Sequence, residues 1–230
     1  MSKYVAVVSG GLDSICYLAQ NIDHNEIFPM IFNYGQKAQK EVDVATKLLD
    51  EISKRFRWVR YRKILDIKFM KELWPGTQLT SSVKVEEAYN PSIVVPLRNA
   101  VFMTIAMAFA KSIDADRLLV GSHTDDTAPY GGMPMYPDST KDFIMRLEET
   151  LHRGHFWWAS PKVEIWFPGR NGMSKVANLK KGYEVLQDMV YETWSCYQSG
   201  EKHCGICESC RNRKKAFKQA GITDKTRYTK

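Results

Sequence analysis

Residues 9–14, close to the start of the chain, combine two glycines with short polar side chains in the order Ser-Gly-Gly-Leu-Asp-Ser. Two adjacent glycines let the backbone approach a bulky polyanion, so that successive N–H groups can point at one cluster of oxygens. Ser9 and Ser14 add hydroxyl donors. The stretch therefore favours phosphate binding, although an ordinary turn between a strand and a helix, capped by Asp13 or a serine, has the same composition.

Asp13 places a further requirement on this stretch. A carboxylate repels phosphates unless a cation lies between them, and this indicates Mg²⁺ at the site. The stretch matches neither Gly-x-x-x-x-Gly-Lys-[Ser/Thr] nor Gly-x-Gly-x-x-Gly, the two common nucleotide-binding patterns. A phosphate bound here would therefore be held differently from the phosphates in those two classes.

A second chemical signal is a cluster of four cysteines, Cys196, Cys204, Cys207 and Cys210, spaced C-x7-C-x2-C-x2-C. Four thiolates this close along the chain can surround one tetrahedral Zn²⁺, and with all four positions filled the zinc would be structural. An iron–sulfur cluster is the open alternative. The clustering argues against a disulfide scaffold and for a reducing compartment. The fifth cysteine, Cys16, is expected to be a small core residue.

Arg98 and Asn99 are a third candidate, because they follow the apolar run at 94–97 and begin an apolar helix. In open α/β sheets, ligands bind where the carboxyl ends of the strands meet. The pair could bind a ligand there or only cap the helix, and the sequence leaves both interpretations open.

Apolar segments must position these residues, and they predict strands at 4–8, 27–32, 57–63, 117–121 and 163–167. Apolar residues at helical spacing predict helices at about 39–55, 99–112 and 140–153. A short helix is expected from residue 174 until Gly182 ends it, followed by a further helix to about residue 190. Alternating strands and helices predict an α/β fold with a five-stranded, mainly parallel sheet and helices on both faces.

The length of 230 residues and the apolar share of 44% fit one globular domain with a small appendage. Without a run of eighteen apolar residues or a charged-then-apolar leader, we expect no membrane span, no signal peptide and a cytoplasmic location. Residues 211–230 hold eight Lys or Arg and one Asp, which accounts for the whole net charge of +7. This tail could bind nucleic acid, form a solvated helix face or compensate the neighbouring thiolates, and nucleic acid is not the favoured partner.

The glycine stretch resembles the Ser-Gly-Gly-x-Asp-Ser loop of the PP-loop ATP pyrophosphatases. Together with the cysteine cluster, it resembles one branch of that superfamily, the 7-cyano-7-deazaguanine synthases (QueC), over nearly the whole chain. The matching patches are residues 9–14, Tyr34-Gly35-Gln36 with Glu41, Val95-Pro96-Leu97-Arg98-Asn99, and residues 204–211 with Arg213, Ala216 and Phe217. Tyr136-Pro137-Asp138 and Ser174-Lys175 match two further family positions.

This resemblance implies an ATP-dependent carbon–nitrogen ligase with the PP-loop (adenine nucleotide α-hydrolase-like) fold. ATP would activate the carboxylate of 7-carboxy-7-deazaguanine as an acyl adenylate, and ammonia would displace AMP to give an amide. A second ATP would help to dehydrate the amide to the nitrile, 7-cyano-7-deazaguanine. The implied cofactors are ATP, Mg²⁺ and structural Zn²⁺. We further expect a homodimer whose chain divides into an ATP-binding domain (1–190) and a zinc-binding helical subdomain (191–230) packed on the same unit.

The same resemblance assigns roles to single residues. Those expected to be catalytic are Asp13, Ser14, Lys175 and Arg98, of which Lys175 and Arg98 would face a phosphate or the substrate carboxylate. Those expected to bind ATP are Val8, Ser9, Gly10, Gly11, Leu12, Asp13, Ser14 and Asn99. Those expected to bind the deazaguanine are Gln36, Tyr136 and Asp138, and Asp138 would accept hydrogen bonds from its amino and ring N–H groups.

The chain departs from the family after Tyr136-Pro137-Asp138, where Ser139-Thr140 stands in place of the usual Cys-Arg. The loop at 123–135 is also longer and differently composed. Three alternatives therefore stay open. One is a ligase that stops at the amide, with ammonia or a macromolecular amine such as a protein N-terminus. The others are a PP-loop enzyme that modifies tRNA and a zinc module that only binds nucleic acid.

Overall fold

The computed structural model describes residues 1–155 and 162–230. Its main sheet has the strand order β3-β2-β1-β4-β7, and all neighbouring strands run parallel. The strands are β1 (Ser2–Val7), β2 (Asn25–Asn33), β3 (Lys63–Asp66), β4 (Arg117–Leu119) and β7 (Glu164–Trp166). The parallel five-stranded sheet predicted from the sequence is confirmed.

The third strand lies later in the chain than the sequence predicted. Residues 57–62 form no strand, and Val59 makes an isolated bridge with Ile27 before β3 begins at Lys63. Val59 is buried, Arg60 is exposed and pairs with Glu26, and Arg62 is largely buried against Asp50. The side chains of both arginines are thus held by ion pairs with other segments and not by a strand, and the prediction was wrong here.

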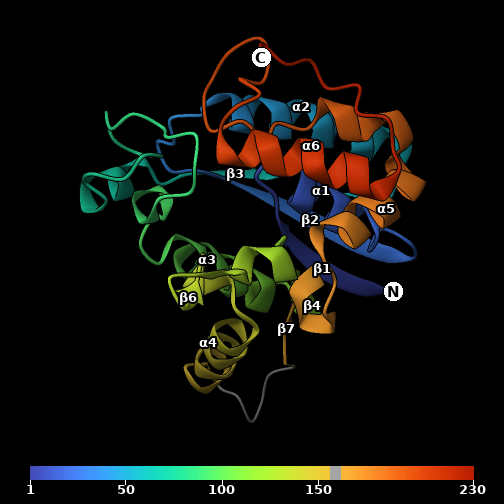
Figure 1. Cartoon of the computed structure of the whole chain (residues 1–230). Coiled ribbons are helices and arrows are strands. Elements are labelled where there is room, and N and C mark those ends of the chain that lie inside the picture. The colour runs from blue at the N-terminus through green and yellow to red at the C-terminus, as the bar shows by residue number, and fades with distance from the viewer. Residues whose placement is uncertain (156–161) are drawn as a thin grey trace.

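Helices cover both faces of the sheet, as predicted (Figure 1). On one face lie α1 (Leu12–Ala19), α2 (Lys40–Arg55), α5 (Lys175–Leu186) and α6 (Glu208–Ala220), and on the other α3 (Arg98–Ser112) and α4 (Lys141–Arg153). Short 3-10 helices fill the connections: η1 (Lys68–Leu73), η2 (Pro91–Ile93), η3 (Thr124–Thr127), η4 (Pro137–Ser139), η5 (Pro168–Asn171) and η6 (Gln187–Glu192). The loop at 123–135 also contains a small antiparallel hairpin, β5 (Pro129–Tyr130) with β6 (Met133–Pro134).

Gly182 does not end a helix, contrary to the prediction. Helix α5 continues through it to Leu186 and passes directly into η6. A Cβ at position 182 would lie 2.4 Å from Cβ of Cys16, so the glycine lets α5 pack closely on α1. Cys16 is fully buried in this contact, which confirms its expected place in the core.

The stretch Pro91–Ser112 is long and apolar enough, by composition alone, to cross a membrane. In the fold, this stretch is not one continuous helix. Leu97, between η2 and α3, has a left-handed backbone (φ 54°), which breaks the stretch into two pieces. Helix α3 then packs against β1 and β4. The apolar residues of α3 are therefore explained as core residues of the domain.

The C-terminal segment is packed into the rest of the molecule. Phe217 of α6 is fully buried in the same core as α1 and α2. Arg213 is also fully buried, and its guanidinium donates to Thr193, Ser195, Thr226 and the carbonyl oxygen of Val190. The division of the chain at residues 190 and 191 stays a prediction.

Candidate active site

One cavity of about 670 Å³ lies at the carboxyl end of the sheet. Its walls come from the turn after β1, the segments after β2 and β4, the starts of α2, α3 and α5, and one side of α6. The predicted residues that line it are Val8, Ser9, Gly11, Leu12, Asp13, Ser14, Gln36, Arg98, Asn99, Tyr136, Asp138 and Lys175. The fold therefore gathers around one space residues that are more than 160 positions apart in the chain.

Gly10 is the one predicted residue outside the cysteine cluster that does not line this cavity. Its φ is +82°, and a Cβ there would lie 2.6 Å from the carbonyl oxygen of Glu41 and 2.9 Å from the backbone N of Ala45. Glycine is therefore required both for the turn and for the contact of this turn with α2. Gly10 shapes the loop that its neighbours present to the cavity.

Three long hydrogen bonds join the N–H groups and hydroxyls of the loop to one another. The backbone N–H of Gly11 donates to Oγ of Ser9, the N–H of Ser9 donates to Oγ of Ser14, and Ser14 donates to the carbonyl oxygen of Gly11, each at 3.2 Å. Bonds of this length are weak. A phosphate oxygen could therefore take over these donors at small cost.

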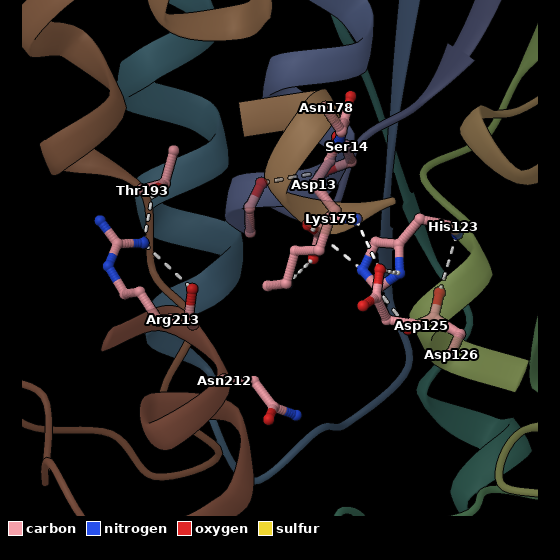
Figure 2. Close-up of polar contacts among 12 residues, drawn as sticks. Asp13, Ser14, His123, Asp125, Asp126, Lys175, Asn178, Thr193, Asn212 and Arg213 are labelled. Atoms are coloured by element: carbon pink, nitrogen blue, oxygen red, sulfur yellow. Dashed lines mark hydrogen bonds and ion pairs between the residues drawn. The ribbon is translucent and has the colours of Figure 1, made fainter. Parts of the chain in front are cut away.

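Asp13, Lys175 and His123 point toward one another from three different elements (Figure 2). Nζ of Lys175 lies 2.5 Å from Oδ2 of Asp13, and Nε2 of His123 lies 3.4 Å from Oδ1. Asp126 and Asp125 complete the group, with carboxylate oxygens 3.5 and 3.7 Å from the imidazole. His123 and Asp126 were not among the predicted residues.

The charges in this group set its protonation. Burial by itself would raise the pKa of Asp13, but the ammonium of Lys175 and the imidazole of His123 hold that pKa well below its usual range. Burial opposes protonation of His123, yet the carboxylates of Asp126 and Asp13 raise its pKa above the ordinary value. Burial also raises the pKa of Asp126. Asp13 is therefore ionised and compensated by cations of the chain itself.

This arrangement bears on Mg²⁺. The sequence argument was that Asp13 needs a cation beside it, and Lys175 supplies one. However, Oδ1 of Asp13 is buried and accepts no hydrogen bond from any residue in the described part of the chain. An oxygen of this kind fits a metal ion or a metal-bound water. The residues present are therefore compatible with Mg²⁺.

Arg98, Asn99 and Asp138 hold one another at the start of α3. The guanidinium of Arg98 donates to the hydroxyl of Tyr34 at 3.2 Å and to Oδ1 of Asn99. Asp138 accepts from the backbone N–H of Asn99 at 3.2 Å and from its side-chain amide at 3.1 Å. Asp138 is 7% exposed. Both of its oxygens thus already have a partner that fixes the helix start.

Tyr136 is tied to the C-terminal segment. Its hydroxyl donates to Oε2 of Glu208 at 3.0 Å, and Tyr197 donates to the same oxygen at 3.2 Å. Asn212 donates to the other oxygen, Oε1, at 3.1 Å. Helix α6 therefore forms one wall of the cavity, which the sequence did not predict.

The four clustered cysteines form a single group. Their sulfurs all lie within 4.8 Å of one another, and those of Cys204 and Cys210 are 3.9 Å apart. A tetrahedral zinc with Zn–S bonds of about 2.3 Å requires sulfurs about 3.8 Å apart. Backbone N–H groups of Gln198 and Cys204 donate to Sγ of Cys196, each at 3.4 Å. The group therefore fits one metal ion such as zinc and is too compact for the several irons of an iron–sulfur cluster.

The chain is similar to known proteins of one family. A family model described as "Queuosine biosynthesis protein QueC" matches residues 3–221. The 7-cyano-7-deazaguanine synthase 1 of Colwellia psychrerythraea is 31% identical, with 98% of each chain covered. The 7-cyano-7-deazaguanine synthase of Caldicellulosiruptor bescii is 34% identical, with 98% of this chain and 97% of the relative covered. Among solved structures, that of a predicted subunit of a tRNA methyltransferase from Methanocaldococcus jannaschii is 15% identical and covers 100% of this chain and 93% of its own, with a TM-score of 0.40.

Proposed function

The chain belongs to the QueC family, and from this premise we propose that it is an ATP-dependent 7-cyano-7-deazaguanine synthase. Its substrates would be 7-carboxy-7-deazaguanine and ammonia, joined through an acyl adenylate and an amide. The proposal rests on one observation: the glycine loop and Lys175 line the same cavity as Arg98 and Tyr136. Adenylation needs the triphosphate and the carboxylate in one space.

The chain's own residues divide the work as follows. The N–H groups and hydroxyls of residues 9–14 would bind the pyrophosphate part of ATP, aided by the positive N-terminal end of α1. Lys175, held by Asp13, would face the charge that develops on the departing pyrophosphate. Arg98 would orient the substrate carboxylate, and Gln36 and Tyr136 would hold the deazaguanine ring. Because Asp138 is committed to Asn99, its contact with the ring would use its remaining lone pairs.

Mg²⁺ belongs to the proposal as a partner of the ATP phosphates. Asp13, through Oδ1, and Asp126 would hold it, and it would supply charge stabilisation to the pyrophosphate leaving group. Zn²⁺ would be structural, since four cysteines leave no open coordination position. A cytoplasmic homodimer stays part of the prediction.

One observation separates this proposal from a thiol-dependent tRNA-modifying enzyme. Cys16 is the only cysteine outside the metal cluster, and it is fully buried against Gly182. Burial raises the pKa of its thiol far above the usual range, so a reactive thiolate is not available there.

The test is incubation of the protein with ATP, Mg²⁺, 7-carboxy-7-deazaguanine and ammonia, with the products identified by mass spectrometry. We expect AMP, pyrophosphate and the nitrile. Amide without nitrile would replace the synthase by an amide-forming ligase. Absence of AMP and pyrophosphate would contradict the whole class.

A further inference from the structure

Glu41 lies in the first turn of α2 and lines the cavity together with Gln36 and Arg98. Its carbonyl oxygen is the atom that Gly10 approaches so closely that no Cβ could fit between them. The start of α2 is therefore fixed against the glycine loop. The Glu41 side chain lines the same cavity as that loop and Arg98, and it lies close enough to Arg98 for the guanidinium charge to influence it.

Glu41 differs from the other acidic residues of the cavity because its carboxyl accepts no hydrogen bond from a described residue. Six acidic residues line the cavity: Asp13, Glu41, Asp125, Asp126, Asp138 and Glu208. All but Glu41 accept hydrogen bonds, from Lys175, His123, Asn99 or Tyr136 and its neighbours. Within residues 1–155 and 162–230, the Glu41 carboxyl makes no hydrogen bond and no ion pair within 4.0 Å. It is the acid left free to act on a ligand.

Burial and a neighbouring charge together set the pKa of the Glu41 carboxyl. Arg98 from α3 is the group whose charge acts on Glu41, and Glu41 in turn raises the pKa of Tyr34, the residue after β2. The neighbouring Lys40 is turned away, toward the ring of Trp194. Burial raises the pKa of Glu41 to about 8, against the lowering effect of Arg98. A base works best when its pKa lies near the working pH.

We propose that Glu41 is the proton acceptor for the amine that attacks the acyl adenylate, an inference that rests on the function proposed above. The C–N bond forms as the amine nitrogen adds to the carbonyl carbon. The C–O bond to AMP breaks, and AMP leaves with the bonding pair. One N–H proton passes to the ionised Glu41 carboxylate, which later releases it to water. The overall products are the amide, AMP and one proton.

The test compares the wild-type protein with Glu41→Gln, which keeps the shape of the side chain and removes the base. Two steps are measured separately: release of pyrophosphate from ATP with 7-carboxy-7-deazaguanine, and amide formation in a single turnover with ammonia. We expect pyrophosphate release to be nearly unchanged and amide formation to fall about 10²–10⁴-fold, the usual effect of a general base. In the wild type, the rate of amide formation, divided at each pH by the concentration of free NH₃, should rise with pH up to about 8, and this rise should be lost in Glu41→Gln.

Hydroxylamine distinguishes a proton acceptor from a structural residue. Its nitrogen is much less basic than that of ammonia, so it loses its proton more readily once the C–N bond has formed. The deficit of Glu41→Gln should therefore shrink markedly when hydroxylamine replaces ammonia. Glu51→Gln, on the exposed side of α2, is the matched control and should behave as the wild type with both amines.

Two results would overturn the inference. One is an equal deficit with ammonia and hydroxylamine. The other is an effect confined to the KM for 7-carboxy-7-deazaguanine, which would make Glu41 a residue that binds the ring. A wild-type protein that releases no pyrophosphate would instead refute the proposed function itself, so the two failures are distinguishable.

Discussion

The hydroxyl of Tyr136 lies 3.0 Å from Oε2 of Glu208, the first residue of α6 and the neighbour of Cys207. This hydrogen bond joins a residue expected to hold the deazaguanine to the segment that carries the metal cluster. The cysteine cluster therefore does more than brace a distant part of the chain, because it fixes one wall of the cavity.

Glu208→Ala should weaken binding of the acceptor and spare ATP. The change leaves the hydroxyls of Tyr136 and Tyr197 without their charged acceptor, and hydrogen bonds to charged groups are worth about 1.5–3 kcal/mol. We expect the KM for 7-carboxy-7-deazaguanine to rise about tenfold or more, with the KM for ATP little changed. Steady-state kinetics would show this, with Glu201→Ala on the exposed surface as the control. An equal rise in both KM values would contradict the assignment.

Removal of the metal should act through the same contact. Without the ion, four thiol groups within 4.8 Å of one another lose the bond that holds them together, so residues 196–210 should loosen. We expect a strong chelator to remove about one zinc per chain, to lower the melting temperature and to abolish acceptor binding. Metal analysis alongside calorimetry would measure this. Retention of full activity by the metal-free protein would refute the coupling.

Lys175→Met should impair adenylation. The substitution removes the ammonium 2.5 Å from Asp13 and leaves a partly buried carboxylate facing the phosphates. We expect pyrophosphate release to slow about 10²–10³-fold, as for the loss of one charge-stabilising group. Lys181→Met, an exposed position on the same helix, serves as the control. If both variants lose activity equally, the effect comes from α5 folding and not from the site.

His123 should make stability depend on pH. Because its pKa is raised in the folded state, its contribution is fully present below the unfolded pKa of about 6.5 and is lost as pH rises through the folded value. We therefore expect His123→Asn to destabilise the protein more at pH 6 than at pH 9. Urea denaturation of both proteins across this range would measure the difference. A constant difference would mean that the imidazole carries no extra proton in the folded state.

Cys16→Ala should leave catalysis unchanged. The thiol is fully buried against Gly182, and the substitution removes only one small atom from the core. We expect wild-type turnover and a loss of stability of about 1 kcal/mol. Pyrophosphate release and thermal denaturation would test both. Loss of turnover in a folded variant would favour thiol-dependent chemistry.

The parts of the site that the sequence could predict are those encoded in short spacings. The glycine loop after the first strand and the four cysteines each lie within one segment, so local chemistry was enough to find them. His123 and Glu208 are different, because their importance depends on partners far away in the chain, Asp13 for His123 and Tyr136 for Glu208. A usable signal did exist for His123, since it lies two residues after the predicted strand at 117–121, at the edge of the sheet where ligands bind.

Errors in the expected elements have a similar origin. Gly182 looked like a helix end because glycine often has that role, and only the approach of Cys16 shows why α5 needs it. A strand was predicted at 57–63, whereas it begins only at Lys63 and the ion pairs of Arg60 and Arg62 are contacts with other segments. The secondary structure at such positions depends on the residues that pack against them, and a single sequence does not show which residues these are.

Arg213 has a consequence for how the molecule meets polyanions. The net charge counted from the sequence includes its guanidinium with the other basic groups near the end of the chain. In the fold, however, this guanidinium is buried among neutral oxygen atoms. Lys214 is half-buried, and its ammonium donates to the carbonyl oxygens of Gly205 and Lys230. The electrostatic field that an approaching RNA would experience is therefore weaker than the isoelectric point suggests, and retention on a heparin column should follow the folded surface.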